Sequence, residues 1–107
     1  MWAWDVPHGT SHRILLYFSL MSNFFVYVLK SKLKNFLYVG YSTDYKERIK
    51  RYNNGDIQST KSFRPYKLVF LEVYINKTDA KRRELYLKTT KGRTTLRTML
   101  RDTLKDI

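Results

Sequence analysis

Two tyrosines occupy related places in two short β-type triplets near the start of this sequence. Tyr27 ends the triplet FVY and Tyr38 begins the triplet YVG, and a glutamate, Glu84, stands much later in a stretch rich in lysine and arginine. Phenols can orient water and exchange protons, and a carboxylate can bind a hard divalent cation. Because the same tyrosines are also typical of an ordinary aromatic hairpin, their chemistry depends on which elements bring them together.

Glu84 lies on a helical stripe where apolar residues are expected. Ala80, Glu84 and Leu87 follow the i, i+4, i+7 spacing that places side chains on one face of a helix. A carboxylate on a core-facing stripe requires a cation, a hydrogen-bond donor or a metal as its partner. The pattern leaves two interpretations open: a structural ion pair, with Lys88 or with an arginine of the preceding helix, or a metal site.

A predicted hairpin positions the two tyrosines. Alternating apolar residues predict strands over Phe24–Lys30 and Phe36–Tyr41, joined by the polar turn Ser31–Asn35. The longest apolar stretch, Tyr66–Ile75, predicts a central strand that is buried on both faces. Glu72 interrupts this third strand, and its role stays open.

The first predicted helix carries a candidate cation. Asp44 and Glu47 have the spacing of a capping box, which predicts a helix over Tyr45–Asn53. Arg48 and Tyr52 are separated by four residues, so they lie on one face of this helix. A solvated basic helix is the simpler interpretation of this segment alone.

Two more helices and a polar loop complete the predicted elements. Residues 55–65 predict a loop, and Lys77–Thr90 predicts a second helix that begins at Asn76 or Thr78 and ends at Lys91-Gly92. The last helix is predicted over Thr94–Leu104. Its apolar stripe comprises Leu96, Met99, Leu100, Thr103 and Leu104. The order β-β-α-β-α-α predicts an α/β domain of the mixed α+β kind.

The charge of the chain predicts a polyanionic partner. The chain has 21 lysines and arginines against 9 aspartates and glutamates, a net charge of +12, which favours nucleic acid over a merely solvated basic surface. We expect no membrane binding, because no predicted helix combines a basic face with Trp, Phe or Leu opposite it. The candidate DNA-binding residues are Lys46, Lys50, Arg51, Lys61, Arg64 and Lys88.

The N-terminal segment and the absence of cysteine give further expectations about the domain bounds, the cellular compartment and the metal ligands. Residues 1–22 are predicted to be an N-terminal extension, with Met21 as a possible true start, and residues 23–107 a single domain. The sequence has no cysteine, which fits a reducing cytoplasm and leaves oxygen atoms as the main metal ligands.

Residues 24–101 resemble the GIY-YIG nuclease superfamily, specifically its small stand-alone bacterial domain proteins and the N-terminal domain of the excision-repair endonuclease subunit. The resemblance rests on an ordered set of motifs rather than on one triplet. These motifs are Phe25-Val26-Tyr27, Tyr38-Val39-Gly40 with Tyr41-Ser42-Thr43-Asp44, Glu47-Arg48, Arg51-Tyr52-Asn53, Pro65 with Leu68–Glu72, and Arg83-Glu84 before Leu87-Lys88.

The resemblance implies a three-stranded antiparallel sheet with helices around it and cleavage of DNA with a divalent metal, Mg²⁺ or Mn²⁺. Tyr27 and Tyr38 match the two motif tyrosines, Arg48 the arginine of the first helix, and Glu84 the metal-binding glutamate. The resemblance implies that Tyr27 orients or deprotonates water, which requires nearby cations to lower its pKa. Tyr52 stands where many members have histidine, and Phe25 where the motif has glycine.

Two functions follow from these expectations. The first is a metal-dependent DNA endonuclease of low specificity, or selective for DNA structure, that acts in repair or recombination. The alternative is a weak or inactive nucleic-acid-binding module that acts with a protein partner. A third interpretation is an accessory domain that directs another nuclease.

Overall fold

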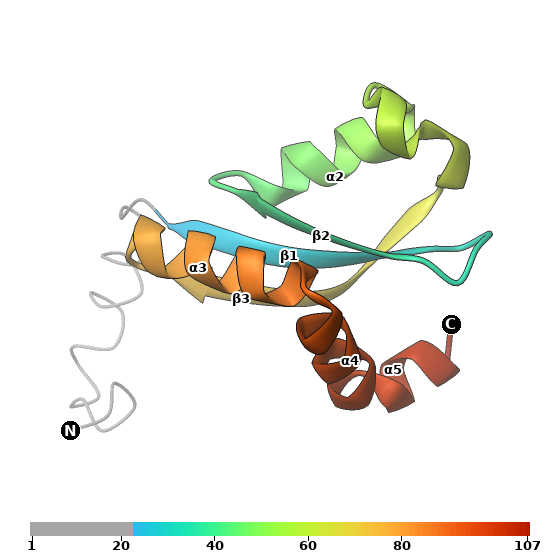
Figure 1. Ribbon diagram of the computed structural model, residues 1–107. Coiled ribbons are helices and arrows are strands. Elements are labelled where there is room, and N and C mark those ends of the chain that lie inside the picture. Colours follow the sequence, from blue (N-terminus) through green and yellow to red (C-terminus); the bar gives the residue numbers. More distant parts are fainter. Residues whose placement is uncertain (1–22) are drawn as a thin grey trace, which may run out of the picture.

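A three-stranded antiparallel sheet forms the middle layer of the protein (Figure 1). The computed structural model describes residues 23–107, so the predicted N-terminal extension and the start at Met21 lie outside the described residues. The strands are β1 (Phe24–Ser31), β2 (Leu37–Ser42) and β3 (Tyr66–Tyr74). Their spatial order is β2-β1-β3, with both pairs antiparallel, so the predicted hairpin is confirmed.

The central strand is β1, and the prediction that the third strand is central was wrong. Val26 and Val28 point to one face of β1 and Tyr27 and Leu29 to the other, and all four are fully buried. Strand β3 is an edge strand that leaves Val73 55% exposed. A continuous apolar run does not reveal whether a strand has one neighbour or two, because edge strands also cover a core with one face.

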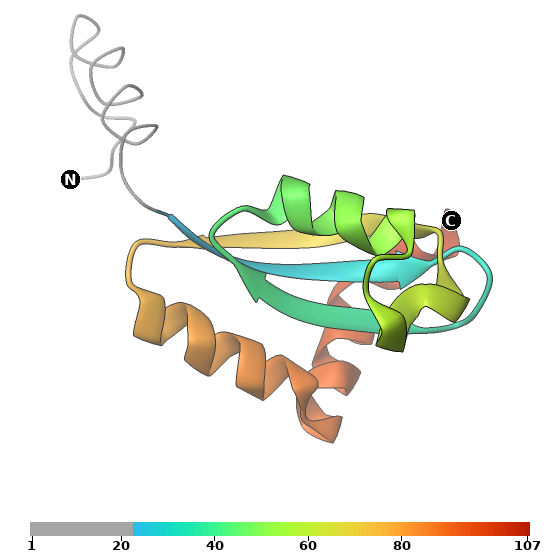
Figure 2. The same ribbon diagram turned by 90° about the horizontal axis from the view of Figure 1, so that it is seen from above.

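Helices cover both faces of the sheet (Figure 1). Helix α2 (Tyr45–Asn54) and the short 3-10 helix η3 (Gln58–Phe63) lie on the face of Tyr27, and η3 occupies part of the predicted loop. Helices α3 (Lys77–Lys88) and α4 (Thr90–Met99) lie on the other face. Seen from above, α3 runs beside the β2 edge of the sheet (Figure 2).

Helices α2 and α3 start at their predicted caps. The Asp44 carboxylate accepts a hydrogen bond of 3.1 Å from the backbone N–H of Glu47 at the start of α2. The Asn76 side chain does the same for Asp79 at the start of α3, at 3.1 Å. These bonds satisfy N–H groups that lack a partner in the first helical turn.

The predicted end of the second helix and the continuity of the last helix were both wrong. Helix α3 ends at Lys88. The Thr89 hydroxyl accepts the N–H of Gly92 at 3.0 Å, and α4 starts at Thr90, four residues earlier than predicted. The last helix is broken at Leu100, after which α5 (Arg101–Lys105) follows. As a result, Met99 is 48% exposed instead of belonging to the apolar stripe.

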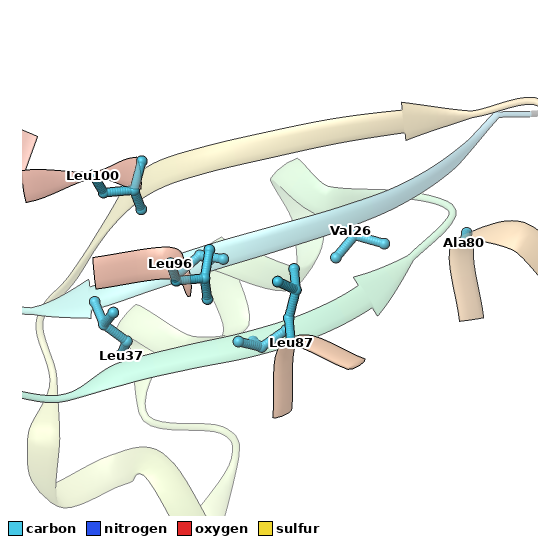
Figure 3. Close-up of a cluster of buried hydrophobic side chains, with 8 residues drawn as sticks. Val26, Leu37, Ala80, Leu87, Leu96 and Leu100 are labelled. Carbon is cyan, nitrogen blue, oxygen red and sulfur yellow. The ribbon is translucent and has the colours of Figure 1, made fainter. Parts of the chain in front are cut away.

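Close contact between α3 and α4 explains why Gly92 lies inside a helix. A Cβ at position 92 would lie 2.7 Å from Leu87 Cα and would overlap the Tyr86 carbonyl oxygen. Glycine is the residue that allows two backbones to approach this closely. The packing brings Leu87 and Leu96 together with Val26, Leu37, Ala80 and Leu100 in one apolar core beneath the sheet (Figure 3).

No helix within residues 23–107 is both long and apolar enough to cross a membrane.

Candidate active site

Four tyrosines gather on the α2 face of the sheet, with Tyr52 at their centre. The ring centroid of Tyr52 lies 6.2 Å from that of Tyr27, 5.0 Å from that of Tyr38 and 5.9 Å from that of Tyr66. The hydroxyls of Tyr27 and Tyr52 form a buried hydrogen bond of 3.2 Å. We call Tyr27, Tyr38, Tyr52 and Tyr66 the tyrosine cluster.

Gly40 creates the space that the Tyr27 ring occupies. Tyr27 on β1 is paired with Gly40 on β2, and a Cβ at position 40 would be 2.6 Å from Tyr27 Cε1 and would overlap Cζ and the hydroxyl. The ring therefore lies across the partner strand toward Tyr52. This contact gives a physical reason for the glycine that closes the YVG triplet.

Arg48 places a positive charge beside the cluster. It lies one helical turn before Tyr52 on α2, and its guanidinium is next to the Tyr27 and Tyr52 phenols. Its Nε is buried and has no hydrogen-bond partner within residues 23–107. A buried guanidinium nitrogen without a partner is energetically unfavourable, so this group is suited to an anionic ligand.

Burial dominates the ionisation of the tyrosine cluster. It raises the pKa of Tyr27 above 10.0, although the hydrogen bond from Tyr52 and the nearby charge of Arg48 act in the opposite direction. Burial, followed by the hydrogen bonds with Tyr27 and Tyr38, also raises the pKa of Tyr52. Both phenols are therefore protonated at neutral pH and can donate hydrogen bonds. The cation beside Tyr27 does not bring its pKa toward neutrality as the general-base expectation required.

Glu84 lies on α3, on the opposite face of the sheet, and is held between two lysines. Its side chain is buried on the stripe with Ala80 and Leu87, as the spacing predicted. Lys88 Nζ lies 3.1 Å from Oε2 and Lys81 Nζ lies 3.3 Å from Oε1. The ion pair with Lys88, one of the interpretations left open by the sequence, is thus present, and Lys81, three residues before Glu84, is a second partner.

The Glu84 carboxylate fits a divalent cation whose other ligands come from water and phosphate. Within the described part of the chain, no three acidic or histidine side chains are grouped to hold a metal. Mg²⁺ commonly uses only one or two protein carboxylates together with waters and substrate phosphates. Lys81 and Lys88 are 48% and 42% exposed, so both can move away from the carboxylate.

The tyrosine cluster and Glu84 are not in direct contact. Among residues 23–107, none of the hydrogen bonds or ion pairs of Glu84 involves Arg48 or a cluster tyrosine. However, both lie near β2: Tyr38 is on this edge strand, and Lys81, a partner of Glu84, stacks 4.6 Å from the Tyr41 ring of the same strand. The β2 edge is therefore a part of the sheet that lies near both groups.

The predicted DNA-binding residues are distributed over several surfaces. Lys46, Lys50 and Arg51 are exposed on α2, Lys61 is exposed on η3, and Arg64 is half-buried. Lys88 differs from these because it is bound to Glu84. The sequence placed Tyr66 in a strand and did not indicate that it belongs to the tyrosine cluster. Its contact with Tyr52 joins segments that are distant in the sequence and leaves no local pattern.

Comparisons of sequence and structure found similar proteins. The family model described as the GIY-YIG catalytic domain matches residues 23–97. A UPF0213 protein of Staphylococcus haemolyticus is 41% identical over 70 residues, which cover 64% of this chain and 84% of that protein. A UPF0213 protein of Clostridium perfringens is 42% identical over 65 residues, which cover 60% of this chain and 69% of that protein.

A solution NMR structure of a UPF0213 protein from Bacillus halodurans is also similar. It is 30% identical, with a TM-score of 0.47, and the match covers 72% of this chain and 84% of that one. The family match spans all three strands, the tyrosine cluster, Arg48 and Glu84. This chain therefore belongs to the GIY-YIG family and carries its catalytic domain.

Proposed function

We propose that this protein is a metal-dependent endonuclease that hydrolyses phosphodiester bonds in DNA, with low sequence specificity or selectivity for DNA structure. The observation that carries the proposal is the state of Arg48. Its guanidinium lies against protonated phenols, it has no carboxylate partner within residues 23–107, and its Nε is unpaired. A phosphate group would supply the missing negative charge and acceptor atoms.

The residues on the α2 face would bind and orient the scissile phosphate. Arg48 would stabilise the charge that develops on the phosphate oxygens in the transition state. Tyr38 is half-buried and can contact substrate directly, whereas Tyr27 is fully buried. Tyr27 would therefore act as a positioning residue, which holds Tyr52 through its hydroxyl and Arg48 through the phenol beside it.

Glu84 would hold the metal from the other side of the β2 edge. When bound, Mg²⁺ or Mn²⁺ supplies Lewis-acid stabilisation of the phosphate and leaving oxygens. The carboxylate becomes available when Lys81 and Lys88 turn outward, and both lysines then lie next to the DNA backbone. A role in DNA repair or recombination in the cytoplasm would follow from such an activity.

The test compares the wild type with Glu84→Gln on plasmid and branched DNA in the presence of Mg²⁺ or Mn²⁺. We expect wild-type nicking that is lost in Glu84→Gln, while DNA binding persists. Glu47→Gln is the matched control, because it removes an exposed carboxylate from α2 and should cut normally. Equal cutting by wild type and Glu84→Gln would exclude Glu84 as the metal ligand.

A nucleic-acid-binding module without hydrolysis is the second candidate. One observation favours it: both carboxylate oxygens of Glu84 are already occupied by lysines. Such a module would bind DNA with an affinity that falls steeply as salt concentration rises, yet would cut none of the substrates with either metal. The same cleavage assay therefore separates the two functions.

A further inference from the structure

A pocket of about 520 Å³ lies between β3 and α3, on the flank of α3 that does not carry the lysine partners of Glu84. It is lined by Tyr74, Asp79, Arg82, Arg83 and Tyr86. Tyr74 comes from the edge strand and the other four residues from α3. The pocket is separate from the tyrosine cluster, because its two tyrosines pack against the apolar core on the other face of the sheet.

Glu72, the acid that interrupts the third strand, fixes the walls of this pocket. Its carboxylate accepts hydrogen bonds from the Tyr74 hydroxyl at 2.9 Å and from Arg83 at 3.0 and 3.2 Å. The Arg83 guanidinium in turn lies 5.7 Å from the centre of the Tyr86 ring. These contacts hold two aromatic rings and one guanidinium plane in set positions before any ligand binds.

The polar ends of the rings are already satisfied. Tyr86 forms a hydrogen bond of 3.2 Å with the hydroxyl of Thr95 on α4, and the Tyr74 hydroxyl is bound to Glu72. The hydroxyls are therefore engaged within the protein, and a ligand in the pocket would contact the rings of Tyr74 and Tyr86. Flat aromatic faces and a guanidinium plane are the surfaces on which unpaired nucleobases stack in proteins.

The charges of the pocket favour a neutral ring over a free phosphate. Arg82 is paired with Asp79 at 2.9 Å and Arg83 with Glu72 at 3.0 Å, so the four ionised groups balance each other. Arg82 and Asp79 are 70% and 56% exposed at the rim, where they offer donors and acceptors to the edge of a base. The net charge of +12 attracts a base that is attached to a phosphate backbone.

We propose that the pocket formed by Tyr74, Tyr86, Arg82, Arg83 and Asp79 binds an unpaired nucleobase of single-stranded nucleic acid. The protein would then contact a strand at two places: at the tyrosine cluster on one face of the sheet and at this pocket on the other. A substrate that has a single-stranded arm beside a duplex would satisfy both contacts. The inference rests on the proposed nucleic-acid partner but not on hydrolysis.

The test measures the affinity of a short single-stranded oligonucleotide and of a blunt duplex by fluorescence anisotropy. Tyr86→Leu removes the stacking surface and should weaken single-strand binding about ten-fold, with little change for the duplex. Tyr86→Phe keeps the ring and loses only the hydrogen bond to Thr95, so it should bind the single strand normally. Thermal unfolding of both variants checks that they are folded.

Two further measurements make the result decisive. Arg82→Gln should weaken single-strand binding more than Arg101→Gln, which removes the same charge from the exposed surface of α5. An oligonucleotide of abasic nucleotides should bind wild type and Tyr86→Leu equally. If Tyr86→Leu binds the single strand as tightly as the wild type, or loses duplex affinity equally, the assignment is wrong.

Failure of this inference is distinguishable from failure of the proposed nuclease function. A wild type that cuts DNA while Tyr86→Leu shows unchanged single-strand affinity would overturn the pocket alone. A wild type that binds single strands through Tyr86 and cuts nothing would overturn the nuclease alone.

Discussion

The phenol of Tyr27 lies over the backbone of Gly40, its antiparallel partner, where other residues would carry a Cβ. This contact turns the Tyr27 ring so that its hydroxyl lies 3.2 Å from the Tyr52 hydroxyl and beside Arg48. The glycine on the edge strand thus determines the position of the Tyr27 side chain on the central strand. The geometry of the candidate site depends on this pair.

Gly40→Ala tests the contact directly. The added Cβ overlaps the Tyr27 ring, so the ring must leave its place, and we expect a loss of about 1–3 kcal/mol in the free energy of unfolding. Urea denaturation gives this value. Thr43→Ala, an exposed change just after the same strand, should remain within about 0.5 kcal/mol of the wild type. Equal stability of both variants would mean that the ring is not confined as described.

The buried phenols predict a loss of stability at high pH. Burial raises the pKa of Tyr27, Tyr52 and Tyr66 above the unfolded value of 10.0. The folded protein then binds protons more tightly, so this contribution to stability is fully present below pH 10.0 and is lost as pH rises through the folded pKa values. The urea concentration at the midpoint of denaturation should therefore fall as pH rises above 10.0.

A double variant identifies the source of that loss. Tyr27→Phe with Tyr52→Phe cannot ionise at these positions, so its stability should fall less steeply with pH than that of the wild type. Thr43→Ala, an exposed change outside the cluster, should keep the wild-type slope. Identical slopes for all three proteins would assign the loss to other groups.

Arg48→Ala should reduce the rate of cleavage more than DNA affinity. Removal of a guanidinium that stabilises the transition state lowers kcat by about 10²–10³-fold, whereas the loss of one phosphate contact has a small effect on the total affinity for DNA. Single-turnover cleavage and equilibrium binding separate the two quantities. Lys50→Ala, an exposed change on the same helix, should show the reverse pattern. Equal losses of rate and affinity in Arg48→Ala would reduce its role to anchoring.

Removing the lysines that hold Glu84 should tighten metal binding. Lys81→Met with Lys88→Met frees both carboxylate oxygens, and exposed ion pairs contribute about 0.2–1 kcal/mol each. We therefore expect about 2–30-fold tighter Mn²⁺ binding in titration calorimetry without DNA. Lys46→Met with Lys50→Met removes the same charge from α2 and should leave Mn²⁺ affinity almost unchanged. Weaker binding in the first variant would show that the lysines do not compete with the metal.

Gly92→Ala should destabilise the protein although alanine favours helices. The gain in helix propensity is about 1 kcal/mol, but the Cβ would overlap the Tyr86 carbonyl oxygen and force α4 away from α3. We expect a net loss of about 1–3 kcal/mol in urea denaturation. Thr94→Ala, on the exposed side of α4, is the matched control and should be neutral or slightly stabilising.

Much of the local structure followed from the sequence alone, because its causes are local. Alternation placed Tyr27 and Leu29 on one face of a strand, and Asp44 and Asn76 marked helix starts through hydrogen bonds to residues three positions away. The inward place of Glu84 followed from helical periodicity in the same way. The order of elements and the motif residues also indicated the family before any contact was known.

Only the tertiary structure decided which distant residues meet. It placed β1 rather than β3 at the centre, put Gly92 inside a helix, and separated Glu84 from the tyrosine cluster by the thickness of the sheet. It also paired Glu72, whose role the sequence left open, with Arg83 in the wall of a pocket. These outcomes depend on packing between segments far apart in the chain, and such packing leaves no periodic signal within any one segment.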